Sequence, residues 1–171
     1  DIITLDDTVS NVEQRIEEVR FANGTIWTHA DLISRAVTYT PGADMITGGT
    51  GADNLRGGGG NDTINGMAGN DTISGDEGDD ILIGGDGTDI FNVTGTSHGF
   101  DSFDGGVGSD TIRATANNTR IGISSVTGIE TATANGFTGV TIVGNAAANV
   151  LNFGNTTLTG TTIHFFDVVD G

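Results

Sequence analysis

The sequence contains no cysteine, one proline and no long apolar run. Without cysteine, no disulfide can stabilise the fold, and for a protein outside the cell a bound metal is the obvious substitute. No apolar run reaches the roughly 20 residues that a membrane-spanning helix needs. The first residues have neither the basic segment nor the apolar segment of a secretory signal peptide. We therefore expect no membrane span, and the N-terminus gives no evidence for export.

Basic residues are also scarce, because six Lys and Arg stand against 23 Asp and Glu, which gives a net charge of −17. This charge argues against nucleic acid or an anionic membrane as a partner and favours cations. No serine lies in a G-x-S-x-G motif, and no lysine follows the glycine-rich segments as phosphate binding would require. The histidines are far apart in the sequence and are expected to be exposed or incidental: His29, His98 and His164. We predict that the chain is not an enzyme.

Glycine and aspartate are abundant, and from Tyr39 to Arg113 they recur every nine residues, apart from the three-residue insertion Val93-Thr94-Gly95. The fourth place of every block is glycine: Gly42, Gly51, Gly60, Gly69, Gly78, Gly87, Gly99 and Gly108. The sixth place is aspartate: Asp44, Asp53, Asp62, Asp71, Asp80, Asp89, Asp101 and Asp110. The eighth place is apolar: Ile46, Leu55, Ile64, Ile73, Leu82, Phe91, Phe103 and Ile112. Three columns in phase over eight blocks exclude a composition bias, and glycines in fixed phase argue against disorder.

The repeat predicts an all-β solenoid. The last three places of each block have strand character, with the eighth side chain directed inward and its neighbours outward. The six preceding places, rich in glycine, can adopt the positive φ angles of a turn at little steric cost. A short strand cannot bury its apolar face alone, so each unit must stack on others.

These blocks resemble the RTX calcium-binding nonapeptide repeat, GGxGxDxUx, over about 75 of the 171 residues. The resemblance implies a parallel β-roll or β-helix in which two blocks complete one coil, so that block n lies on block n+2. Aspartates eighteen residues apart then face each other. Two close carboxylates repel unless a hard divalent cation lies between them. The resemblance therefore implies bound Ca²⁺, about four to six ions.

The ligand set follows from the same resemblance. The eight sixth-place aspartates are expected to bind calcium, each shared between neighbouring ions. The turns are expected to add backbone carbonyl oxygens from Gly48, Thr50, Gly51, Gly57, Gly59, Gly60, Gly66, Ala68, Gly69, Gly75, Glu77, Gly78, Gly84, Asp86, Gly87 and Gly105.

Residues 1–38 follow a different pattern. Strands are predicted at Arg15–Phe21 and Thr25–Trp27 on either side of an Asn23-Gly24 turn, followed by a short helix at Ala30–Ala36. The string IEEVRFANGTIWTHADLI resembles the end of a haemolysin-type calcium-binding-related module. The expected role is a structural cap in which Trp27 and Phe21 cover the open end of the roll, and a carbohydrate-binding role for Trp27 is the alternative.

Residues 114–171 keep the solenoid pattern but lose the calcium columns. In the first block Ile121 keeps the eighth place, whereas Asn117 and Thr119 stand where glycine and aspartate would be. We predict a metal-free continuation with turns held by Asn and Thr hydrogen bonds. Its strands are expected near Ile129–Ala134, Val140–Val143, Val150–Phe153 and Ile163–Val169. The chain ends on Asp170-Gly171 as if entering another turn, so we expect it to be part of a longer protein.

The predicted function is a calcium-binding module of a larger secreted bacterial protein. RTX proteins leave the cell through a one-step exporter that reads a signal near the C-terminus, so folding on calcium outside the cell would support secretion and stabilise the covalently linked domains. The alternative is an extracellular adhesin or glycan-binding accessory module with a polysaccharide or a cell surface as partner. An outward row of threonines hints at that alternative: Thr131, Thr133, Thr157 and Thr159.

Overall fold

The computed structural model describes residues 18–20, 26–28, 41–144, 157–159 and 164–166. The chain divides into two units, Asp1–Thr38 and Tyr39–Gly171. In the first unit, β1 (Glu18–Arg20) pairs antiparallel with β2 (Ile26–Thr28), with Val19 opposite Trp27. These two strands agree with the strands predicted on either side of Asn23-Gly24. The predicted helix lies outside the described residues.

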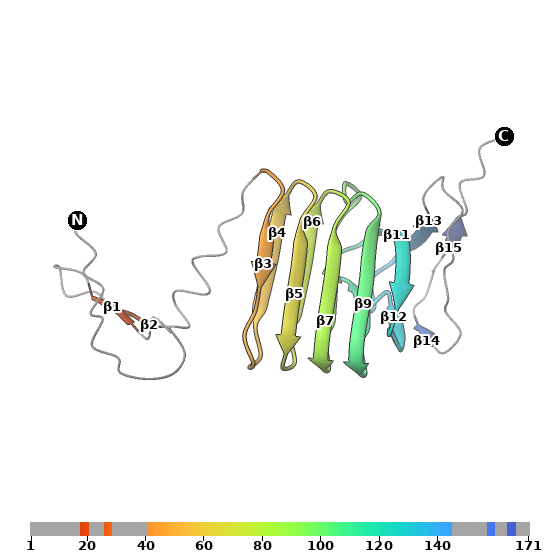
Figure 1. Cartoon of the computed structure of the whole chain (residues 1–171). Helices are drawn as coiled ribbons and strands as arrows, with labels where there is room; N and C mark the ends of the chain where they lie inside the picture. Colours follow the sequence, from red (N-terminus) through yellow and green to blue (C-terminus); the bar gives the residue numbers. More distant parts are fainter. Residues whose placement is uncertain (1–17, 21–25, 29–40, 145–156, 160–163, 167–171) are drawn as a thin grey trace. The chain divides into compact units, whose positions relative to one another are not determined.

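The second unit is built from parallel strands that alternate between two sheets (Figure 1). One sheet has seven strands: β3 (Met45–Thr47), β5 (Thr63–Ala68), β7 (Ile81–Gly87), β9 (Asp101–Gly108), β11 (Arg120–Thr127), β13 (Thr141–Gly144) and β15 (His164–Phe166). The other sheet has six: β4 (Asn54–Gly59), β6 (Thr72–Glu77), β8 (Ile90–Val93), β10 (Thr111–Ala114), β12 (Thr131–Thr133) and β14 (Thr157–Thr159). Each coil contributes one strand to each sheet, which confirms the predicted all-β solenoid.

Two blocks complete one coil. In the seven-stranded sheet Ile46 pairs with Ile64 and Ile64 with Leu82, a step of eighteen residues. In the six-stranded sheet Leu55 pairs with Ile73 by the same step. Across the insertion the step becomes twenty-one residues, because Leu82 pairs with Phe103. The insertion therefore lengthens one turn and leaves the stacking of the blocks intact.

The eighth-place side chains fill the space between the two sheets, as their pattern predicts. Those of the six-stranded sheet are Leu55, Ile73, Phe91 and Ile112, and those of the seven-stranded sheet include Ile64, Leu82 and Phe103, all at most 1% exposed. Phe91 and Phe103 meet edge to face across the core, with ring centroids 5.6 Å apart. Each buried side chain of this size stabilises the fold by about 1.5–3 kcal/mol.

The strands are longer than the sequence predicts. β4, β5 and β6 each contain six residues, because the first three places of the next block continue the strand. The second of these places has positive φ, as at Gly58, Met67 and Asp76, yet pairing continues beyond it, with Gly59 opposite Glu77. Turns are thus confined to the fourth to sixth places, where Gly60 has a φ of 104°.

Beyond Arg113 the register departs from the nine-residue period. Phe103 pairs with Val126, twenty-three residues later, and Ile121 pairs with Ile142. The step is already twenty-two residues at Asp101 and Ile123, and a register irregularity between Ile123 and Ser125 in β11 adds one more. No strand was predicted from the sequence at the positions of β11 and β14.

The other predicted C-terminal strands agree with the structure where it describes them. β12 and β13 lie where strands are expected near Ile129–Ala134 and Val140–Val143, and β15 lies within Ile163–Val169. The strand expected at Val150–Phe153 lies outside the described residues. Asn and Thr side chains hold turns in this part, since Asn117 Oδ1 accepts the Thr138 N–H at 3.0 Å.

Candidate metal centre

The sixth-place aspartates form two columns along the roll. The Asp44 column precedes the strands of the seven-stranded sheet and contains Asp44, Asp62, Asp80 and Asp101. The Asp53 column precedes the strands of the six-stranded sheet and contains Asp53, Asp71, Asp89 and Asp110. In both columns the backbone N–H of each aspartate except the last donates to Oδ1 of the aspartate one coil later, at 2.8–3.0 Å. The structure thus brings together all eight predicted aspartates.

The second carboxylate oxygen, Oδ2, differs from Oδ1 in its hydrogen bonding. The buried aspartates Asp62, Asp71, Asp80, Asp89 and Asp110 are at most 1% exposed, and the Oδ2 atom of each has no hydrogen-bond partner. A buried oxygen of an ionised carboxylate without a partner costs free energy that the fold must recover. Each of these oxygens therefore needs a proton or a cation.

The first-place glycines leave room for such a cation. A Cβ on Gly48 would lie 2.7 Å from Asp53 Oδ2 and 2.6 Å from the carbonyl oxygen of Gly66. The next two coils repeat this geometry. A Cβ on Gly66 would lie 2.6 Å from the carbonyl oxygen of Gly84, and a Cβ on Gly84 would lie 2.6 Å from the carbonyl oxygen of Gly105. A carboxylate oxygen and a carbonyl oxygen from the next coil converge at each position. A hard cation prefers this set of oxygen donors.

The other predicted carbonyl ligands are partly placed by the structure. The fourth-place carbonyl groups of Gly51, Gly60, Gly69 and Gly87 lie against the fourth-place glycine of the next coil. The third-place carbonyl of Asp86 accepts the Gly69 N–H at 2.8 Å. Within the described part of the chain, no three Asp, Glu or His side chains gather as a metal cluster. Coordination in the columns would therefore depend on backbone oxygens in addition to the carboxylates.

Burial perturbs the acidity of the columns. Loss of solvation is the largest cause that raises the pKa of Asp62, Asp71 and Asp110. The backbone hydrogen bond that each carboxylate accepts lowers its pKa in part, and neighbouring carboxylates raise it further. The same causes raise the pKa of Asp80 to about 6 and that of Asp101 to about 7. Without a cation, ionisation of these five aspartates is therefore less favourable than that of an exposed aspartate.

These shifts predict how the stability of the metal-free chain depends on pH. A carboxyl group with a higher pKa in the folded state contributes stability below its unfolded pKa, near 3.8, and the contribution is lost as the pH rises through the folded pKa. Metal-free protein is thus expected to have a higher thermal midpoint at pH 5 than at pH 8. Circular dichroism melts in metal-depleted buffer measure this, and a midpoint that rises with pH over that interval would contradict it.

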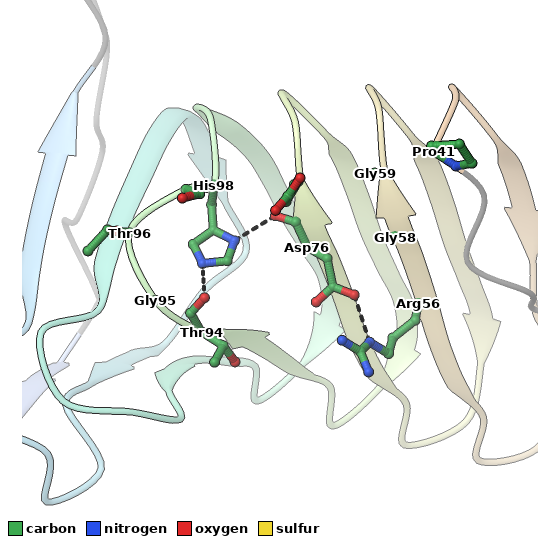
Figure 2. Close-up of a pocket in the computed structure, with 11 residues that line it drawn as sticks. Pro41, Arg56, Gly58, Gly59, Asp76, Thr94, Gly95, Thr96 and His98 are labelled. Carbon is green, nitrogen blue, oxygen red and sulfur yellow. Dashed lines mark hydrogen bonds and ion pairs between the residues drawn. The ribbon is translucent and has the colours of Figure 1, made fainter.

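His98 is buried, contrary to the expectation from its sequence context. It is 7% exposed and lies in the loop lengthened by the insertion, where its Nδ1 is 2.5 Å from the carbonyl oxygen of Asp76 and its Nε2 contacts the carbonyl oxygen of Thr94 (Figure 2). The Asp76 side chain in turn accepts a hydrogen bond from Arg56 Nε at 2.7 Å. His98 therefore connects the lengthened loop to the preceding coil, through the carbonyl group of Asp76. His29 lies outside the described residues, and His164 begins β15.

One acidic residue of the columns is absent from the sequence prediction. The backbone N–H of Asp110 donates to Glu130 Oε2 at 2.7 Å, as the other members of its column donate to an aspartate. The segment Gly128-Ile129-Glu130-Thr131-Ala132 retains the order glycine, acid and apolar residue of the repeat, and this order was the available signal. The Asp44 column has no equivalent, because Ile123 pairs with Asp101.

A two-sheet parallel roll with stacked acidic turns defines the chain as a repeat β-solenoid with oxygen-rich turns. The family model described as "RTX calcium-binding nonapeptide repeat (4 copies)" matches residues 38–73, 57–91 and 98–121. The model of the "Haemolysin-type calcium binding protein related domain" matches residues 1–31. The chain thus carries RTX haemolysin-type calcium-binding repeats preceded by that related domain.

No curated protein and no solved structure matches the chain. RTX repeats form a structural calcium-binding module and are not a known enzyme family. In the part that the structure describes, no helix is long and apolar enough to cross a membrane.

Proposed function

We propose that calcium ions bind between successive coils along both aspartate columns, and that residues 39–113 fold when they bind. The observation that carries the proposal is the set of five buried Oδ2 atoms without hydrogen-bond partners, at Asp62, Asp71, Asp80, Asp89 and Asp110. Calcium takes six to eight oxygen ligands in flexible geometry, which suits a site made of carboxylates and turn carbonyl groups. About four to six ions would neutralise the columns.

Each chemical group has a defined role in the proposed sites. An aspartate would use Oδ1 to accept the N–H of the preceding coil and Oδ2 to hold the ion, so one side chain serves both the backbone and the metal. First-place glycines such as Gly66 and Gly84 would supply carbonyl oxygens and, by lacking a side chain, the space for the ion. When bound, calcium would supply the positive charge that the stacked carboxylates lack.

The setting that suits this chemistry is outside a bacterial cell. The chain would be a module of a larger secreted protein, unfolded where calcium is scarce and folded where calcium is abundant. Six bound ions would change the net charge from −17 to about −5, which removes most of the self-repulsion. Residues 1–38 would form a separate N-terminal region and residues 114–171 a continuation of the roll outside the repeat motif.

Counting bound calcium tests the proposal. At 1 mM free calcium, native mass spectrometry of the 171-residue chain is expected to show at least four bound ions per chain. The same measurement with magnesium is the control, because magnesium demands a tighter octahedral geometry and gives up its water reluctantly. A chain that binds no calcium at this concentration would exclude the proposed function.

One observation favours an adhesin or glycan-binding module as a second candidate. Thr131 pairs with Thr157 and Thr133 with Thr159, so four threonines form two short rows on β12 and β14. Hydroxyl rows on a flat sheet can donate hydrogen bonds to a repeating polymer. A glycan array probed with the calcium-loaded chain separates the candidates, and retained glycans would favour the second.

A further inference from the structure

The Asp53 column continues for one coil beyond the repeat motif. The N–H of Asp110 donates to Glu130 Oε2 at 2.7 Å, where Asp89 donates to Asp110 Oδ1 at 2.8 Å. The backbone repeats as well, because Thr131 N–H donates to the Asp110 carbonyl at 3.0 Å, as Thr111 N–H donates to the Asp89 carbonyl at 2.9 Å. Glu130 therefore holds the place of the next aspartate.

The carbonyl oxygen of this level is also present. A Cβ on Gly105 would lie 2.6 Å from Asp110 Oδ2 and would collide with the carbonyl oxygen of Gly128. One level earlier, a Cβ on Gly84 would collide with Asp89 Oδ2 and lie 2.6 Å from the carbonyl oxygen of Gly105. The two levels thus bring a carboxylate oxygen and a carbonyl oxygen of the next coil to the same point.

The carboxylate at this level lacks a partner. Asp110 is fully buried, and its Oδ2 has no hydrogen-bond partner. Burial raises the pKa of Asp110, and the charges of Asp89 and Glu130 raise it further. The Asp44 column differs at its end, because Ile123 pairs with Asp101 and offers no oxygen from its side chain.

We propose that Glu130 completes an additional calcium site with Asp110 and the carbonyl group of Gly128, in the part of the chain that has lost the repeat motif. This inference rests on the proposed function, since it extends calcium binding by one level of the Asp53 column. The column then ends in a glutamate in place of an aspartate, and the two columns end differently.

The additional site has fewer protein ligands than the levels before it. Four residues separate Gly105 from Asp110, whereas Ile129 alone separates Gly128 from Glu130. The shortened turn cannot offer the third-place and fourth-place carbonyl groups of a complete repeat. Water must then complete the coordination shell, and the site has a lower calcium affinity than the sites at Asp71 and Asp89.

The variant Glu130→Gln tests the site, because its amide oxygen can still accept the Asp110 N–H while the negative charge is lost. Native mass spectrometry at 1 mM free calcium is expected to show one ion fewer than in the wild-type chain. The matched control is Asp104→Asn, which removes an exposed charge near Asp110 that is not part of the column. This control is expected to bind as many ions as the wild-type chain.

A double-mutant cycle with Asp110→Asn covers the case in which Glu130→Gln folds poorly. The increase in thermal midpoint on adding calcium is expected to be the same in Asp110→Asn and in the double variant Asp110→Asn/Glu130→Gln, because both changes remove the same site. Additive losses, or an unchanged ion count and calcium affinities in Glu130→Gln, would overturn the inference. A wild-type chain without bound calcium would overturn the proposed function instead.

Discussion

Removal of calcium is expected to unfold the roll. Extracellular calcium modules bind with dissociation constants of about 10⁻⁴ to 10⁻³ M. At a tenfold excess over such a constant, each ion stabilises the folded state by about 1.4 kcal/mol, so four to six ions contribute roughly 6–8 kcal/mol. A whole domain has a net stability of about 5–15 kcal/mol. Calcium therefore supplies a large part of the free energy that keeps the coils together.

Far-ultraviolet circular dichroism in EDTA and in millimolar calcium measures this effect. At 37 °C the β signal is expected to vanish in EDTA and to return when calcium is restored, with a steep dependence on calcium concentration because neighbouring sites share aspartates. The metal-free roll is expected to keep its β signal only at low temperature, so its thermal midpoint lies below 37 °C. Magnesium at the same concentration is the control for ionic strength. A β signal that chelation leaves unchanged would refute calcium-dependent folding.

The second large effect is expected for Asp71→Asn, whose effect on stability should change sign between the calcium-free and the calcium-bound chain. Its Oδ1 accepts the Asp53 N–H at 2.8 Å, and its Oδ2 is buried beside Gly66 and the carbonyl oxygen of Gly84. In Asp71→Asn the amide oxygen keeps the first contact, and the amide nitrogen can donate to the Gly84 carbonyl. The variant is expected to be more stable than the wild-type chain without calcium, because a buried charge is gone. It is expected to be less stable with calcium, because a shared ligand is gone.

Thermal melts of both proteins at zero and at 5 mM calcium measure the inversion. Asp71→Ala, which also leaves the Asp53 N–H without its acceptor, is expected to lower calcium affinity at least tenfold, a loss of about 1.4 kcal/mol per affected site. Asp110→Ala, nearer the end of the column, is expected to lose less. Asp104→Asn is again the matched control and should change neither condition. Equal destabilisation of Asp71→Asn with and without calcium would show that the Asp71 carboxylate does not hold calcium.

The regular part of the fold was predictable because one set of side chains fixes both the strands and the columns. The nine-residue phase predicts that the eighth-place side chain faces inward, and Ile64 is buried as expected. Asp62 and Gly66, two places before and after it, are buried as well. The eighteen-residue pairing was implied by the resemblance and is confirmed by the sheet register. The length of the strands was not predicted, because glycine-rich residues at positive φ resemble a turn in sequence while their backbones still pair.

The departures from the period were not predictable in the same way. Glu130 was missed because it lies twenty residues after Asp110 in place of eighteen, so the acid is out of phase with the repeat. Val126 takes the place next to Phe103 because the coil before it is longer than two repeats and β11 adds a one-residue register irregularity, and no residue type marks either in the sequence. His98 is buried through contacts with backbone carbonyl groups of a lengthened loop, and such contacts have no periodic signature.

The hydrogen bonds along the columns all run in one direction. In the described part of the columns, each carboxylate from Asp62 to Asp101 and from Asp71 to Glu130 accepts the backbone N–H of the acidic residue one coil before it. The stack of coils therefore has a direction, and its two ends are chemically different. Among these side-chain contacts, shortening the chain from the C-terminal side removes the acceptor of the last aspartate N–H that remains, whereas shortening it from the N-terminal side removes a donor.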